Sequence, residues 1–140
     1  MSLLPGDTGR PRNAESERQA LALLDAYMDT FNAHDWAANA AILHYPHVRI
    51  SGARVTTWDS AEAYAAANRD RIDRTFEQGW HRSSWDERVV VDGSDDKVHV
   101  LVRFTRYDQR GAALASYPSL WIVTLIDDHW GVQARSTFAP

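Results

Sequence analysis

The 140-residue sequence contains no cysteine, a single lysine and no long apolar run. Without cysteine the chain has no disulfide, no thiol catalysis and no cysteine-bound zinc, which is compatible with the cytoplasmic location that we expect. No run approaches the roughly 18 apolar residues of a membrane span. The N-terminus lacks a basic start followed by an apolar core, so we expect no secretory signal and no membrane association.

The sequence also has fewer basic than acidic residues. The net charge is -4, and Lys97 is the only lysine among mostly arginine basic residues. A nucleic-acid partner usually requires a basic stripe, so we expect none here. We interpret the preference for arginine as a compositional bias rather than a phosphate site.

Motifs for cofactors and metals are missing as well. The sequence has no glycine-rich phosphate loop, no Gly-x-Ser-x-Gly elbow and no dinucleotide fingerprint, which argues against covalent and nicotinamide mechanisms. His44 and His47 are separated by Pro46 in non-helical chain, so the argument for helical ligand pairs does not apply. We therefore expect no metal and no organic cofactor.

What the sequence does have is regular periodicity after an N-terminal arm at residues 1–14, which we expect to be flexible because of its prolines and glycines. Residues 15–140 are expected to form one domain. Apolar steps of three and four residues predict helices, and alternation with turn residues predicts strands. The expected helices are 15–33, 36–43 and 60–78, and the expected strands are 47–50, 54–57, 80–92, 97–107, 113–125 and 130–138.

Helices followed by hairpin-connected strands indicate an α+β fold, with three N-terminal helices packed on a strongly curved antiparallel sheet. The segment 120–125 is apolar on both faces, and Leu101 and Tyr107 lie on the face of their strand opposite the valines. A sheet that is apolar on both sides is covered on both sides. Because the helices cover one side, we expect a homodimer through the outer face, with His99 in or near the interface.

Two phrases resemble a known family. Tyr27-x-x-x-Phe31-Asn32-Ala33-His34-Asp35 resembles the first-helix signature of the nuclear-transport-factor-2-like superfamily, and residues 130–139 resemble the last strand of its SnoaL-like members. The resemblance covers about residues 15–139 and implies a cone of helices and bent sheet around a pocket. The superfamily includes isomerases, dehydratases, cyclases and non-catalytic binders, so the fold does not give the function.

The resemblance also allows one mechanism to be compared residue by residue. In ketosteroid isomerase a tyrosine of the first helix helps to form the oxyanion hole, and Tyr27 matches it. The general-base aspartate of that family corresponds to Ser51, and its second acid falls near Trp121. Neither acid is present, which argues against ketosteroid isomerisation.

The same comparison places alternate residues of several strands on the pocket face together with Tyr27. These residues are His47, Arg49, Ser51, His81, Ser83, Trp85, Tyr117, Ser119, Trp121, Val123, Val132, Ala134, Ser136 and Phe138. An aromatic pocket of this kind suits an uncharged or anionic aromatic or polycyclic molecule. Arg135, on the opposite parity, is expected to point outward as a salt-bridge partner.

His81 is the first candidate for proton transfer, because imidazole titrates near neutral pH; the alternative is a histidine at the surface end of its strand. His47 and Arg49 are candidates for binding an oxyanion. The alternative is that Arg49 is a surface arginine paired with Asp86 or Glu87. Tyr27 is either a hydrogen-bond donor to substrate or a core tyrosine. The remaining candidates are substrate-binding residues or simple wall: Trp85, Trp121, Tyr117, Ser51, Ser119 and Phe138.

The sequence therefore supports three hypotheses. The first is a cofactor-independent acid/base enzyme (dehydratase, isomerase, cyclase or lyase type) acting on a small aromatic or polycyclic molecule. The second is a non-catalytic binding protein with the same pocket, and the third is a protein-interaction subunit. Convergent titratable groups in the pocket would favour the enzyme, and an apolar pocket would favour the binding protein.

Overall fold

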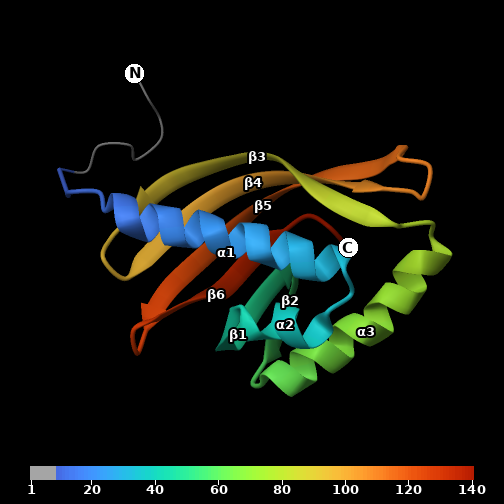
Figure 1. Ribbon diagram of the computed structural model, residues 1–140, viewed down its shortest axis with the longest axis horizontal. Coiled ribbons are helices and arrows are strands. Elements are labelled where there is room, and N and C mark those ends of the chain that lie inside the picture. The colour runs from blue at the N-terminus through green and yellow to red at the C-terminus, as the bar shows by residue number, and fades with distance from the viewer. Residues whose placement is uncertain (1–8) are drawn as a thin grey trace.

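The computed structural model describes residues 9–140, apart from the side chains at positions 73, 76 and 77. In this range the chain forms three helices and six strands, in the order expected from the sequence (Figure 1). In chain order the elements are α1 (Ala14–Asn32), α2 (Trp36–Ala41), β1 (Leu43–Ser51), β2 (Arg54–Trp58), α3 (Ala61–Glu77), β3 (Arg82–Gly93), β4 (Lys97–Tyr107), β5 (Ala113–Ile126) and β6 (His129–Thr137).

All six strands join one sheet in the order β2-β1-β6-β5-β4-β3. The sheet is curved and open, and the helices pack on it. The helix α1 crosses the consecutive long strands β3 to β6 (Figure 1). The expected α+β fold is confirmed, with one correction to the sheet. The strands β1 and β6 pair in parallel, because the last strand returns beside the first after the chain has passed through α3 and the other long strands.

The periodic apolar residues form the core between helices and sheet. Ala20, Leu24 and Tyr27 of α1 are buried, and they face the alternating valines Val98 and Val100 of β4. Burial of such side chains contributes about 1.5–3 kcal/mol each relative to exposure. The same alternation that predicts the strand therefore also sets which face of the sheet meets α1.

The signature at the end of α1 fastens the helices to the sheet. Asn32 forms two hydrogen bonds with the backbone of Ser83, one through Nδ2 to the carbonyl and one from the Ser83 N–H to Oδ1. His34 turns the chain with a φ of 57°, and the Asp35 carboxylate accepts from the N–H of Ala38 at the start of α2. The break and the cap are those expected from the sequence.

The region around Pro46 differs from the prediction. The strand β1 begins at Leu43 rather than His47, and α2 ends at Ala41. Pro46 follows a cis peptide bond inside β1. Its missing N–H is tolerated because pairing with β2 begins only at His47 and the pairing with β6 is irregular between Leu43 and Val48.

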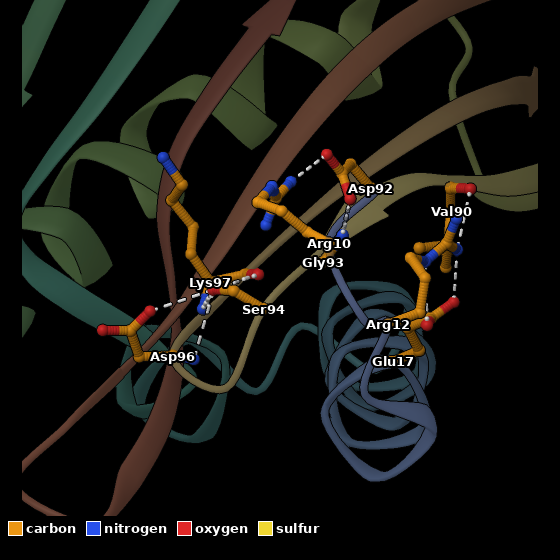
Figure 2. A network of polar contacts seen from close by, with 9 residues as sticks. All are labelled: Arg10, Arg12, Glu17, Val90, Asp92, Gly93, Ser94, Asp96 and Lys97. Carbon is orange, nitrogen blue, oxygen red and sulfur yellow. Dashed lines mark hydrogen bonds and ion pairs between the residues drawn. The ribbon is translucent and has the colours of Figure 1, made fainter. Parts of the chain in front are cut away.

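The N-terminal arm contacts the body of the domain where the structure describes it. Figure 2 shows Arg10 paired with Asp92 of β3, and Arg12 paired with Glu17 of α1 at 2.5 Å. We expected residues 1–14 to be flexible, and residues 1–8 of this arm lie outside the described residues. Within residues 9–140 no helix combines the length and the apolar character needed to cross a membrane.

Candidate functional site

A small cavity lies on the inner face of the sheet, under α1 and α3. Its volume is about 60 Å³, well below the roughly 300–1,000 Å³ of pockets that enclose drug-sized ligands. Its walls are mainly aromatic and cationic. The aromatic residues are Tyr27, Phe31, Trp85, Phe104 and Trp121; the cationic residues are Arg49, Arg71, Arg106 and Arg135; and Met28, Ser83, Ser119, Thr137 and Ala139 complete the lining.

Arg135 is the centre of the site and is buried, with 8% of its surface exposed. Its Nη1 donates to the Tyr27 hydroxyl at 2.9 Å, its Nη2 to the Tyr64 hydroxyl at 3.0 Å, and its Nε to His47 Nε2 at 3.1 Å. The guanidinium also lies against the rings of Tyr27, Tyr64 and Trp121 at 5.3–5.6 Å. Three side chains from three elements therefore fix the orientation of one cation.

His47 supports Arg135 as a neutral acceptor. Its Nδ1 lies 3.0 Å from the Val132 carbonyl, which requires a proton on Nδ1 and leaves Nε2 to accept from Arg135. Burial lowers the pKa of His47 to about 3, and the positive charge of Arg135 acts in the same direction. This histidine therefore stays uncharged at neutral pH.

The hydroxyls of Tyr27 and Tyr64 lie 2.6 Å apart beside Arg135. Burial raises the pKa of Tyr27. Burial acts in the same sense on Tyr64, but the Arg135 charge and the hydrogen bond with Tyr27 outweigh it and lower the pKa of Tyr64. Burial lowers the pKa of Arg135, and the two tyrosines more than offset that effect and raise it. Among residues 9–140 no described carboxylate lies within 4 Å of Arg135.

Arg49 adds a second buried cation on the neighbouring strand. Its Nη2 donates to the Ala139 carbonyl at 3.2 Å, while its Nε has no partner among the described residues. Burial, together with the charges of Arg71 and Arg135, lowers the pKa of Arg49 to about 10. At neutral pH this residue is still a cation, so the cavity is strongly positive.

The structure brings together five of the expected site residues. Tyr27, Arg49, Trp85, Ser119 and Trp121 all line the cavity, as does Ser83 from the wider expected face. Trp85 Nε1 donates to the Leu24 carbonyl, which orients that ring against α1. His47 lies directly behind Arg135 and is 0% exposed.

Four other expected residues are elsewhere. His81 is exposed just before β3, outside the cavity lining. Its backbone N–H donates a hydrogen bond to the Tyr107 carbonyl. Ser51 uses its hydroxyl to bind the Ala139 carbonyl at 2.6 Å. Tyr117 lies outside the lining, below Arg106 at 5.2 Å, and Phe138 is 74% exposed. A role for His81 at the cavity has no support in this position.

The predicted directions of the Phe138 and Arg135 side chains are wrong for one reason. Between β5 and β6 the pairing shifts by one residue, since Val123 faces Val132 while Ile122 faces Ala134. The extra residue, Gln133, is a β-bulge, and it reverses the alternation of the strand. Val132 and Arg135 therefore both face inward, and Ser136 and Phe138 face outward.

Sequence reasoning also missed Tyr64, Arg71 and Arg106. A signal for Tyr64 was present in α3, because Tyr64, Asn68 and Ile72 recur at steps of four and are all buried. Arg71 and Arg106 carry no comparable signal, since a charged residue on a helix or strand usually faces solvent. Among the described residues no group of three or more His, Asp or Glu side chains is arranged to hold a metal ion.

Comparisons with known proteins agree with this architecture. The family model described as NTF2-like protein (DUF6841) matches residues 16–137. No curated protein matches the chain in sequence.

Solved structures resemble the chain in fold at low sequence identity. A protein of unknown function with a cystatin-like fold from Nostoc punctiforme has a TM-score of 0.74 at 11% identity, over 91% of this chain and 93% of that one. Aln2 from a Streptomyces species has a TM-score of 0.70 at 17% identity, over 91% and 93%. A ketosteroid isomerase-like protein from Erwinia carotovora atroseptica has a TM-score of 0.66 at 19% identity, over 91% and 99%.

The fold of these neighbours confirms the resemblance drawn from the sequence, and at these identities it says nothing of activity. The family model covers most of the chain, from the start of α1 to the end of β6. The chain therefore belongs to the NTF2-like proteins.

Proposed function

We propose that this chain is a cofactor-independent acid/base enzyme that binds a small organic molecule in the cavity. The observation that carries the proposal is Tyr27, which lines the cavity and whose hydroxyl belongs to the buried Tyr64–Arg135 network. A fixed donor beside a buried cation stabilises negative charge that develops on a reacting oxygen. The small cavity favours a molecule of about one ring over a polycyclic one.

The hydrogen-bond count leaves one hydroxyl proton of the tyrosine pair for a ligand, and Tyr27 is the member of the pair that lines the cavity. Tyr27 and Tyr64 share one hydrogen bond and carry two hydroxyl protons, while Arg135 donates to both oxygens. Either hydroxyl can donate within the pair, and when a ligand oxygen takes the Tyr27 proton, Tyr64 becomes the donor to Tyr27. Because burial raises the pKa of Tyr27, this hydroxyl keeps its proton and acts as a donor or general acid.

A second candidate function is non-catalytic binding of the same kind of molecule. The observation in its favour is that none of the described residues lining the cavity is a histidine, aspartate or glutamate. In an enzyme, proton transfer would therefore depend on Tyr27 and its partner Tyr64. A binding protein needs only the shape of the cavity and its hydrogen-bond donors.

The experiment is a ligand screen followed by incubation of each ligand with the protein. Small aromatic acids, ketones and phenols are tested by thermal shift, since a ligand at a hundredfold over its Kd stabilises by about 2.7 kcal/mol. Hits are then incubated and analysed by mass spectrometry for conversion. We expect Tyr27→Phe to lower kcat by about 10²–10³-fold, as loss of one such donor does elsewhere.

The matched control is Tyr107→Phe, which removes a hydroxyl outside the cavity lining. It should keep full activity. Turnover by Tyr27→Phe at the rate of the unmodified protein would refute the proposed role of this residue. Binding without conversion of any hit would establish the non-catalytic alternative, and absence of any binding would contradict both.

A further inference from the structure

Two buried N–H groups of residues that line the cavity have no acceptor. Arg49 Nε and Trp121 Nε1 lack partners among the described residues, although their side chains are only 7% and 3% exposed. Both residues line the cavity. Buried donors in folded proteins are almost always paired, because an unpaired one loses its water without compensation. A ligand with acceptor oxygens would supply the partner that these two N–H groups lack.

These two donors stand on either side of Arg135. Arg49 of β1 is the register partner of Arg135 in β6, and Arg135 is the register partner of Trp121 in β5. Adjacent strands lie about 4.8 Å apart, so the three side chains form one row on the inner face. The unpaired donors thus flank the buried cation.

The charge around the cavity is of one sign. Arg49, Arg71, Arg106 and Arg135 all line it, and among residues 9–140 no described carboxylate lies within 4 Å of any of them. Like charges directly opposite each other on neighbouring strands are destabilising. Arg49 and Arg135 are such a pair, and an anion bound in the cavity relieves their repulsion.

From these contacts we infer that the ligand of this cavity is an organic acid, whose carboxylate accepts from Arg49 Nε and Trp121 Nε1 and whose short body, about one ring, packs on Trp85 and Phe104. The inference rests on the proposed function, because it names the class of molecule for the same cavity. A carboxylate offers two acceptor oxygens for the two unpaired donors, and its charge complements the guanidinium of Arg49. A phosphate or phosphonate shares the charge but brings a third oxygen.

The test is calorimetric titration of the full chain at constant ionic strength with four probes. Benzoate and benzamide have the same ring and nearly the same shape but differ in charge, while phenylphosphonate and inorganic phosphate report on the alternative anion. We expect benzoate to bind at least about tenfold more tightly than benzamide, since hydrogen bonds to a charged group are stronger than neutral ones. Benzoate should also bind more tightly than either phosphorus compound.

Two variants remove the donors one at a time. Arg49→Gln should weaken the binding of benzoate at least about tenfold and the binding of benzamide much less. Trp121→Phe keeps an aromatic ring but lacks the indole N–H. It should therefore also reduce the difference in affinity between benzoate and benzamide. The matched control is Arg54→Gln, which deletes an exposed arginine of β2 outside the cavity and should leave benzoate binding unchanged. Circular dichroism and the melting temperature establish that each variant is folded.

The outcomes separate the two proposals. Equal affinity for benzoate and benzamide overturns the carboxylate inference while leaving a small-molecule pocket in place. Tighter binding of phenylphosphonate than benzoate overturns it in favour of a phosphate-type anion. Binding of neither aromatic compound, nor of other acids and amides of one ring, overturns the inference and the proposed function together. If Arg49→Gln does not fold, an unchanged preference for benzoate in Trp121→Phe is sufficient to refute the inference.

Discussion

Arg135 is the residue on which the proposals depend. A buried charge is costly unless hydrogen bonds and an opposite charge compensate it. Arg135 has its three hydrogen bonds to Tyr27, Tyr64 and His47, yet the nearest compensation is a pair of phenols rather than a carboxylate. Shifted pKa values beside a cavity mark this arrangement as a candidate functional site.

The neutral state of His47 predicts a pH dependence of stability. The pKa of His47 is about 3 in the folded chain and about 6.5 in the unfolded chain, so its contribution is complete above pH 6.5 and is lost as pH falls toward 3. The slope is about 1.4 kcal/mol per pH unit. Urea unfolding should show a loss of up to about 2 kcal/mol from this residue between pH 6.5 and 5.

The variant that checks the pH prediction is His47→Gln. Its amide oxygen can accept from Arg135, but it takes up no proton in this range. The free energy of unfolding of the variant should fall less steeply between pH 6.5 and 5. The difference in slope corresponds to about one proton fewer taken up on unfolding. Parallel curves for the two proteins would show that His47 is not held neutral by the fold.

At the scale of elements, β6 decides which residues reach the cavity. Its bulge at Gln133 turns Arg135 inward, and just before the bulge Gly131 lies against the ring of His44. A Cβ added at Gly131 would lie 2.8 Å from two atoms of that ring. His44 Nε2 is held by the carbonyls of Thr124 and His129 at 3.1 and 2.8 Å. The ring therefore cannot move aside without losing these contacts.

We predict that Gly131→Ala lowers the free energy of unfolding by about 1–3 kcal/mol, the usual effect of overpacking. Urea denaturation followed by tryptophan fluorescence measures this change. Adding His44→Ala should recover part of the loss in a double-mutant cycle, because the clash is specific to that ring. Additive effects of the two substitutions would show that Gly131 is required for another reason.

At the scale of the whole molecule, the outer face of the sheet remains open. Val89, Leu101 and Leu120 are register partners across β3, β4 and β5, and Val89 and Leu101 are 46% and 42% exposed. His99 Nε2, next to this row, is buried without a partner among the described residues. We propose, as from the sequence, that a second copy of the chain covers this face.

Sedimentation equilibrium tests the proposed homodimer. The protein should sediment as a dimer, and Leu101→Glu should shift it toward a monomer, because a carboxylate buried in an apolar interface is unfavourable. Val55→Glu on β2, where Val55 is 62% exposed and away from this row, serves as the control and should remain dimeric. A monomeric unmodified protein, or a dimer unaffected by Leu101→Glu, would contradict the proposal.

The sequence by itself determined the elements and their order, because helical and strand periodicities are local properties of the chain. The strand Lys97–Tyr107 has the predicted bounds, and the break at His34 with the cap at Asp35 is also as expected. Within the site, the positions of Tyr27, Arg49, Trp85, Ser119 and Trp121 on the cavity wall were predicted from the alternation and the family resemblance.

Only the tertiary structure decided how these elements meet. The bulge in β6 depends on its pairing with β5 and reverses the alternation on which the prediction for Arg135 and Phe138 was based. The parallel pairing of β1 with β6 places Arg49 beside Arg135, although the two are far apart in sequence. The convergence of Tyr27, Tyr64 and His47 on one guanidinium comes from contacts between distant segments, and no local pattern in the chain encodes it.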